Sequence, residues 1–200
     1  MNVVIVKYNA GNTQSVIYAL NRLGVEPRVS DEPEVLQSAD KVIFPGVGEA
    51  SSAMNYLRAK GLDLVIKNLR QPVLGICVGL QLLCRHSEEG NVNCMGIFDV
   101  AVRRFQPPLE EQLKVPQVGW NNLFDLRSPL FEGIAPQHAY VYFVHSYYAE
   151  LSPYTVAKAH YCLDFSAALH KDNFYAIQFH AEKSGVIGAK ILDNFLRLCT

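Results

Sequence analysis

The sequence has few of the features that mark disulfide-linked, membrane-spanning or nucleic-acid-binding proteins. Its five cysteines are an odd number with no Cys-x-x-Cys pair, which argues against a disulfide framework and favours reduced thiols. No apolar run approaches the roughly 20 residues of a membrane span, and the first residues lack a charged leader region. The net charge is −1, with Arg103-Arg104 as the only basic doublet, so a nucleic-acid footprint is missing. We therefore expect a globular, cytoplasmic protein.

Metal and phosphate motifs are missing as well. The histidines have no metal-ligand spacing with each other or with the cysteines, so no metal site is expected. The glycine-rich segment Pro45-Gly46-Val47-Gly48 lacks the Gly-Lys-Ser/Thr of a phosphate loop. These absences direct attention to chemistry carried by side chains alone.

The hydrophobic pattern predicts an α/β fold with a central, mostly parallel sheet, flanking helices and a strand-rich C-terminal half. In the first half, apolar runs alternate with segments of helical periodicity, which is typical of parallel strands joined by helices. No linker or repeat interrupts the 200 residues, so a single domain spanning residues 1–200 is expected. Strands are predicted at 3–6, 41–44, 73–76, 98–104, 115–119, 140–144, 155–160 and 175–179, and helices at 14–23, 53–69 with a break at Gly61, 78–84 and 185–198.

The most informative segment is Gly75-Ile76-Cys77-Val78-Gly79, where a predicted strand meets a predicted helix. It is the thiol version of a nucleophile elbow, a sharp turn whose flanking glycines prevent side-chain clashes. A cysteine there lies at a helix N-terminus, where the dipole favours thiolate. The alternative is a buried structural cysteine at a tight turn. We take the other four cysteines as structural.

A base for this thiol is available in Gln178-Phe179-His180-Ala181-Glu182. In extended backbone, residues two apart project to the same side, so Glu182 could bind one ring nitrogen of His180 while the other faces Cys77. The alternative is a solvated His–Glu pair after a strand.

A third segment, Phe44-Pro45-Gly46-Val47-Gly48-Glu49, ends a strand and opens a helix. Its glycines free the backbone to present amides to a developing negative charge, and they allow a peptide to flip. Alone, the pattern also fits an ordinary glycine-rich connection.

These three segments occur in the order found in class I, or triad, glutamine amidotransferases, which the chain resembles along nearly its whole length. The shared pattern is Pro-Gly-x-Gly, then Gly-x-Cys-x-Gly-x-Gln, then His-x-Glu. Within the family, the chain is most similar to the glutaminase subunits of imidazole glycerol phosphate synthases, in histidine biosynthesis. The matches are at 8–16, 116–121, 143–148 and 178–185.

The resemblance implies a role for each matched residue. Cys77 would be the nucleophile, His180 the base and Glu182 its orienter. The backbone at Val47, Gly48 and Val78 would form the oxyanion hole, Gln81, His145, Ser146 and Tyr147 would hold glutamine, and Asn12, Trp120 and Lys183 would face a partner. The family usually has proline where this chain has Ala181, which leaves the backbone of His180 less constrained.

The implied reaction is hydrolysis of glutamine through a Cys77 thioester, with no cofactor. The ammonia would pass to a synthase, or cyclase, subunit with a (β/α)₈ barrel in a heterodimer, which forms imidazole glycerol phosphate and AICAR. Three alternatives stay open: a glutaminase for anthranilate, guanylate or pyridoxal phosphate synthesis, a free cysteine hydrolase, and a non-catalytic regulatory subunit. Co-purification with a barrel partner would decide the first, substantial turnover by the isolated chain would indicate the second, and a glutamate-release assay would decide the third.

Overall fold

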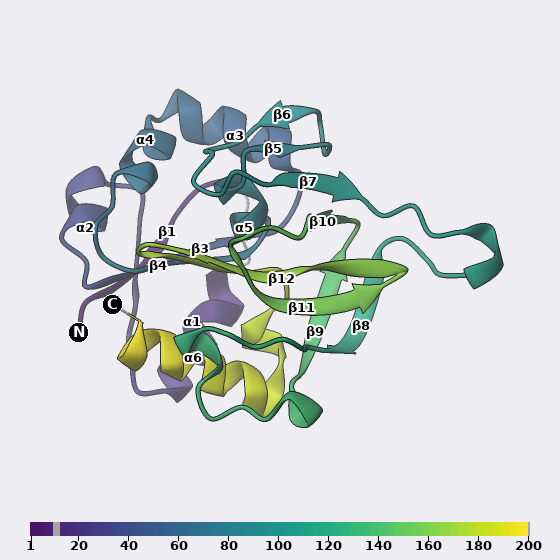
Figure 1. Ribbon diagram of the computed structural model, residues 1–200. Helices are drawn as coiled ribbons and strands as arrows, with labels where there is room; N and C mark the ends of the chain where they lie inside the picture. Colours follow the sequence, from purple (N-terminus) through teal and green to yellow (C-terminus); the bar gives the residue numbers. More distant parts are fainter. Residues whose placement is uncertain (10–12, 200) are drawn as a thin grey trace.

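The computed structural model describes residues 1–9 and 13–199 as a mixed β-sheet with helices on both faces (Figure 1). The strand order is β2-β1-β3-β4-β13-β12-β10-β7-β5-β6, and β11 pairs with β12. Helices α1 and α6 lie below the sheet in Figure 1, and α3, α4 and α5 lie above it. The helices are α1 (Thr13–Arg22), α2 (Pro33–Gln37), α3 (Ala50–Ala59), α4 (Leu62–Lys67), α5 (Val78–Leu83) and α6 (Gly185–Leu198). None of the helices in the described part of the chain is long and apolar enough to cross a membrane.

Five neighbouring strands form the parallel half of the sheet: β2, β1, β3, β4 and β13. Helices cover both faces here, so β1, β4 and β13 are buried along their whole length and their sequences are continuous apolar runs. Parallel strands end at the same edge, so the segments that follow β3, β4 and β13 converge there. These strands are β1 (Val3–Val6), β2 (Arg28–Ser30), β3 (Lys41–Gly46), β4 (Val73–Cys77) and β13 (Phe174–Ile177).

The part of the chain between α5 and β13 extends the sheet with mainly antiparallel pairs and adds a separate two-stranded sheet of β8 and β9. Between β7 and β8, a long arm that includes the 3-10 turn η1 projects to the right in Figure 1. The remaining strands are β5 (His86–Ser87), β6 (Val92–Asn93), β7 (Ala101–Arg104), β8 (Gln117–Asn122), β9 (Tyr140–His145), β10 (Tyr147–Ala149), β11 (Thr155–Tyr161) and β12 (Leu163–Lys171); the 3-10 turns are η1 (Leu109–Glu111), η2 (Pro129–Phe131), η3 (Pro136–His138) and η4 (Ala181–Lys183).

The predicted fold class is confirmed, and several element boundaries need correction. The last helix spans the predicted residues, and the predicted break at Gly61 is present because that residue adopts a left-handed φ of 68°. The strand expected at 115–119 begins later, at Gln117, since Pro116 has no N–H to offer a ladder. The strand expected at 98–104 contains only its last four residues. The nine-residue strand β12 was not predicted.

Candidate active site

Helix α5 packs closely against the sheet because glycines occupy the points where the two meet. A Cβ added at Gly79 would overlap the carbonyl oxygen of Phe44, and one at Gly75 would lie 3.0 Å from the carbonyl carbon of Gly79. A Cβ at Gly46, at the end of β3, would lie 2.9 Å from Cβ of Val78. The prediction that the glycines around Cys77 prevent side-chain clashes is therefore confirmed.

Cys77 ends β4 and precedes the first residue of α5 in a backbone conformation that non-glycine residues rarely adopt. Its φ is 55° and its ψ is −111°. Such a conformation costs of order 1–3 kcal/mol, and it persists because the strand before Cys77 and the glycine-packed helix after it fix both ends. The residue is 4% exposed. This is the strained strand-to-helix turn that the sequence predicted.

The side chains of His180 and Glu182 are in contact, as expected, although the backbone between them differs from the prediction. Nδ1 of His180 lies 2.7 Å from Oε1 of Glu182, and both side chains are nearly fully buried. His180 is extended, with φ −90° and ψ 95°, but Glu182 belongs to the 3-10 turn η4. The turn brings the carboxyl of Glu182 to Nδ1 of the ring, so the prediction of extended backbone at Glu182 was wrong.

The main chain of His180 is held from two sides. Its N–H donates to the carbonyl of Tyr142 on β9 at 2.9 Å, and its carbonyl accepts the hydroxyl of Ser184 at 2.6 Å. The same hydroxyl accepts the N–H of Tyr142 at 2.9 Å. Strand β9 and the start of α6 therefore set the position of the imidazole.

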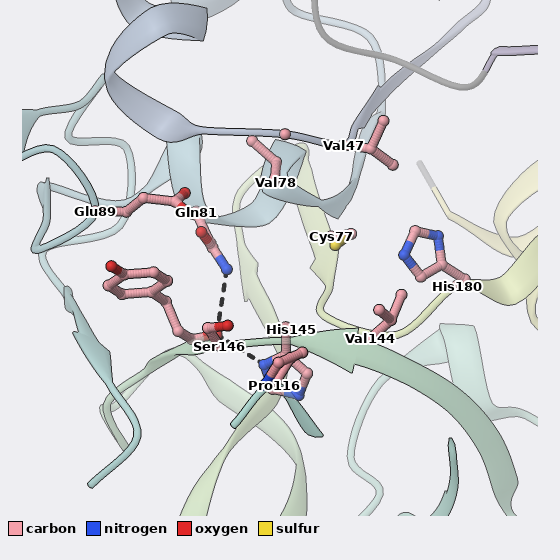
Figure 2. A pocket seen from close by; sticks show the side chains of 12 residues that line it. Val47, Cys77, Val78, Gln81, Glu89, Pro116, Val144, His145, Ser146 and His180 are labelled. Atoms are coloured by element: carbon pink, nitrogen blue, oxygen red, sulfur yellow. Dashed lines mark hydrogen bonds between the residues drawn. The ribbon is translucent and has the colours of Figure 1, made fainter. Parts of the chain in front are cut away.

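Buried charge interactions change the proton affinity of His180. Burial lowers the pKa of the imidazole, but the Cys77 thiol and the Glu182 carboxyl raise it more, to about 10. Nε2 of His180 has no hydrogen-bond partner among the described residues, and Figure 2 shows the ring beside Cys77. An imidazolium next to a thiol favours the thiolate, which is the reactive form.

A cavity of about 360 Å³ opens at this edge of the sheet (Figure 2). Its size fits one small molecule. Cys77 and His180 lie at one side of it and Glu89 at the other in Figure 2. The predicted residues that line the cavity are Val47, Gly48, Cys77, Val78, Gln81, His145, Ser146, Tyr147 and His180; Glu89, Pro116 and Val144 complete it.

Two of the predicted binding residues are held by hydrogen bonds to one carbonyl, that of Tyr147. Nε2 of Gln81 donates to it at 3.2 Å, and Nδ1 of His145 lies 2.7 Å from it. Burial, with a smaller contribution from His180, lowers the pKa of His145 to about 4 although the Tyr147 carbonyl opposes this, so the ring is neutral at pH 7. Oε1 of Gln81 is buried without a hydrogen-bond partner in the described part of the chain.

Sequence reasoning missed two residues of the site. Glu89 lines the cavity, accepts the N–H of Ala50 at 2.9 Å, and has a pKa raised chiefly by burial. Gln178 is fully buried between Cys77 and Gln81. Glu89 follows another glutamate in a turn with no recognisable motif, so no sequence signal marked it. Gln178 was inside the quoted His-x-Glu segment, but nothing there indicated which way its side chain points.

Two of the predicted partner-facing residues, Trp120 and Lys183, are not among the residues that line the cavity. Trp120 on β8 is 58% exposed, and a Cβ added at Gly185 would lie 3.9 Å from its ring. Lys183 is exposed on η4, two residues before Gly185. Trp120 and Lys183 therefore belong to neighbouring parts of the surface. Asn12 lies outside the described residues.

Comparison with known families agrees with this geometry. The profile of the family described as glutamine amidotransferase class-I matches residues 4–199. The chain belongs to the class I glutamine amidotransferases. The resemblance to this family seen in the sequence is thus confirmed.

Similar proteins cover the chain from end to end. The imidazole glycerol phosphate synthase subunit HisH of Bacteroides thetaiotaomicron is 61% identical over 198 residues, which are 99% of this chain and 100% of the relative. The protein of the same name from Escherichia coli K12 is 47% identical over 200 residues, again 99% and 100%. Among solved structures, PurLQS of Thermotoga maritima has a TM-score of 0.71 at 16% identity, covering 100% of this chain and 99% of that one, and supports the fold alone.

Proposed function

We propose that this amidotransferase is a glutaminase subunit that hydrolyses L-glutamine and delivers ammonia to an imidazole glycerol phosphate synthase. The observation that carries the proposal is that Cys77 and His180 line the same cavity, with the ring of His180 bound to Glu182. The relatives named imidazole glycerol phosphate synthase subunit HisH support the choice of synthase. They favour it over anthranilate, guanylate or pyridoxal phosphate synthesis.

The reaction follows from the roles that we assign. The Cys77 thiolate attacks the side-chain carbonyl carbon of glutamine, and the resulting oxyanion is held by backbone N–H groups at Val78 and in the Val47-Gly48 segment. His180, oriented by Glu182, gives its proton to the departing nitrogen, so ammonia leaves and a thioester remains. Water then loses a proton to His180 and attacks the thioester. Glutamate is released, and the thiolate–imidazolium pair is restored.

The cavity also suggests how glutamine lies in it. The free acceptor Oε1 of Gln81 and the carboxyl of Glu89 are both at the end away from His180 in Figure 2. Two acceptors suit an ammonium group, so we place the α-amino group of the substrate there. Its side-chain amide then extends toward Cys77. Ser146 and Tyr147 would line the route between the two ends.

We further propose that a cyclase subunit, a (β/α)₈ barrel, binds this chain as a heterodimer across Trp120 and Lys183, with Asn12 nearby. The whole chain, residues 1–200, would act as one domain in the cytoplasm. We expect the isolated chain to turn over slowly, because the Pro45-Gly46-Val47-Gly48 peptide would present its oxyanion amide only in the complex. One oxyanion donor is worth about 10²–10³ in rate. Gly48, with φ +102° and open space around it, has the backbone freedom that such a flip needs.

The test is glutamate release by the full chain, alone and with the synthase subunit and its acceptor ligand, for wild type and Cys77→Ala. We expect strong activation of the wild type and no glutamine hydrolysis by the variant, while synthesis from free ammonia survives. A high rate without the partner that does not rise on its addition would refute delivery of ammonia. Retained hydrolysis in Cys77→Ala would refute the thioester mechanism.

A further inference from the structure

We propose that Gln178 is a positioning residue that stabilises the Cys77 sulfur and fixes which atom Gln81 presents to the substrate. The proposal rests on the function proposed above and adds a residue to its machinery. Gln178 follows the last residue of β13, beside the end of β4, and is fully buried. Its side chain is therefore enclosed between the nucleophile and the binding pocket.

Three hydrogen bonds form a relay that runs from the carbonyl of Tyr147 through the side-chain amides of Gln81 and Gln178 to the sulfur of Cys77. Nε2 of Gln81 donates to the carbonyl of Tyr147 at 3.2 Å and to Oε1 of Gln178 at 3.2 Å. Nε2 of Gln178 in turn lies 3.8 Å from Sγ of Cys77. Both polar atoms of the Gln178 side chain have a hydrogen-bond partner. Oε1 of Gln81, by contrast, has no partner in the described part of the chain.

The carbonyl of Tyr147 sets the direction of this relay. A main-chain carbonyl only accepts hydrogen bonds, so Gln81 must turn its NH₂ group toward Tyr147. The same NH₂ group also donates to Gln178, which must therefore accept with its side-chain oxygen. The NH₂ group of Gln178 then faces sulfur. One fixed acceptor thus determines the orientation of both amides without any charged group.

This orientation has two consequences for the reaction. An N–H directed at the sulfur stabilises the thiolate more than the thiol, because hydrogen bonds to charged groups are the stronger ones. The oxygen of Gln81, a residue that lines the cavity, is left as a fixed acceptor without a partner among the described residues. Without Gln178, Gln81 would keep one of its two hydrogen bonds and could rotate. The ionisable groups facing the sulfur are His180 and Tyr8, and His145 acts on His180; all three are unchanged in the variants below.

Two measurements on the full chain separate the two effects. The first is the pH dependence of Cys77 alkylation by iodoacetamide, followed on the Cys77 peptide by mass spectrometry so that the other cysteines do not interfere. The second is the KM for glutamine in the complex with the synthase subunit. For Gln178→Leu we expect the alkylation midpoint to rise by about one pH unit and KM to rise about tenfold. Gln178→Met, of similar length and without a donor, should behave alike and is the second variant if the first does not fold.

Gln81→Leu should raise KM by a similar factor and leave the alkylation midpoint in place. In the double variant, KM should rise no further than in Gln81→Leu, while the midpoint shift of Gln178→Leu remains. Asn194→Leu is the matched control, since Asn194 is also a buried amide, bonded to the carbonyls of Leu130 and Glu132 at 3.0 and 2.9 Å. It should lower stability without changing either readout.

An unchanged alkylation midpoint in both Gln178 variants would overturn the contact with sulfur. If the KM increase of the double variant were the product of the increases in the two single variants, the relay from Gln178 to Gln81 would be overturned. If the wild type released no glutamate even with the synthase subunit, the proposed function would fail, but the alkylation measurement would still decide whether Gln178 acts on Cys77.

Discussion

Replacing Gly79 by alanine should disrupt the elbow by pushing helix α5 away from the sheet. The added methyl would overlap the carbonyl oxygen of Phe44 and lie 3.1 Å from its carbonyl carbon. Real Cβ atoms essentially never come within 3.0 Å of a heavy atom outside their own residue and its two chain neighbours. The obstacle is the backbone of β3, which is paired on both sides and cannot turn aside as a flexible side chain would.

Two opposing effects set the size of the loss. Alanine is favoured over glycine inside a helix by about 1 kcal/mol, whereas overpacking a tight interior costs about 1–3 kcal/mol and sometimes more. The clash here involves main chain on both sides, so we expect the upper end and a net loss of about 2 kcal/mol. That loss corresponds to about 4–8 °C in Tm, or about 1 M in the urea midpoint. Because α5 has only six residues, it should move as a unit and displace Cys77.

The assay is thermal and urea unfolding followed by circular dichroism, together with the rate of Cys77 alkylation. Gly24→Ala is the matched control: it has a left-handed φ of 77° but open space around it, and lies at the end of α1. It should lower Tm through backbone strain and leave alkylation of Cys77 unchanged. A Gly79→Ala protein with wild-type Tm and alkylation rate would refute the claim that close packing positions the nucleophile.

Three further predictions concern the histidines and Ala181. The rate of thioester formation should fall further in His180→Ala than in Glu182→Gln, by on the order of 10–100-fold, because transferring the proton is a larger task than orienting the ring. Single-turnover rates measure this difference, and a larger loss in Glu182→Gln would mean that the two roles are exchanged. Ala181→Pro should keep activity and raise the free energy of unfolding, measured in urea, by up to about 1 kcal/mol, since His180 is already extended and Ala181 is the first residue of η4. Loss of activity with an intact fold would contradict this. Burial lowers the pKa of His145 from 6.5 to about 4, so between these two pH values the unfolded chain binds more protons than the folded chain. The free energy of unfolding should therefore fall by up to ~3 kcal/mol as pH drops from 7 to 4. His145→Asn should flatten this dependence in urea titrations, and an unchanged slope would count against it.

The parallel half of the fold was predictable because burial on both faces leaves a clear record in the residue types. Strand β12 left no such record. Its sequence, Leu163–Lys171, contains Ser166, Ala167 and Ala168, which are fully buried but small and not typical of strands. Ser166 is accommodated because its hydroxyl donates to the carbonyl of Glu150 at 2.7 Å. That partner is distant in sequence, so no local pattern could have indicated the strand.

The candidate site divides in the same way. The nucleophile elbow was visible because its turn and its close packing both require glycine, and glycine at fixed offsets can be seen in a sequence. The contact of His180 with Glu182 was predicted correctly, although the 3-10 turn behind it was not. Glu89 and Gln178 enter the site through neighbours that only the folded sheet supplies. Residue spacing carries no information about such contacts.

The amides of Gln81 and Gln178 also differ from the glycines in what they contribute. The glycines under α5 serve folding and positioning together, so a variant there should lose both. A buried amide pair contributes less to stability, because replacing both partners of a hydrogen bond by apolar groups of similar shape is often nearly neutral. The unpartnered oxygen of Gln81 even carries a desolvation cost that an apolar residue would avoid. The double variant Gln81→Leu with Gln178→Leu should therefore fold about as well as the wild type, which makes substrate binding and thiolate formation, rather than stability, the reason for two amides at this position.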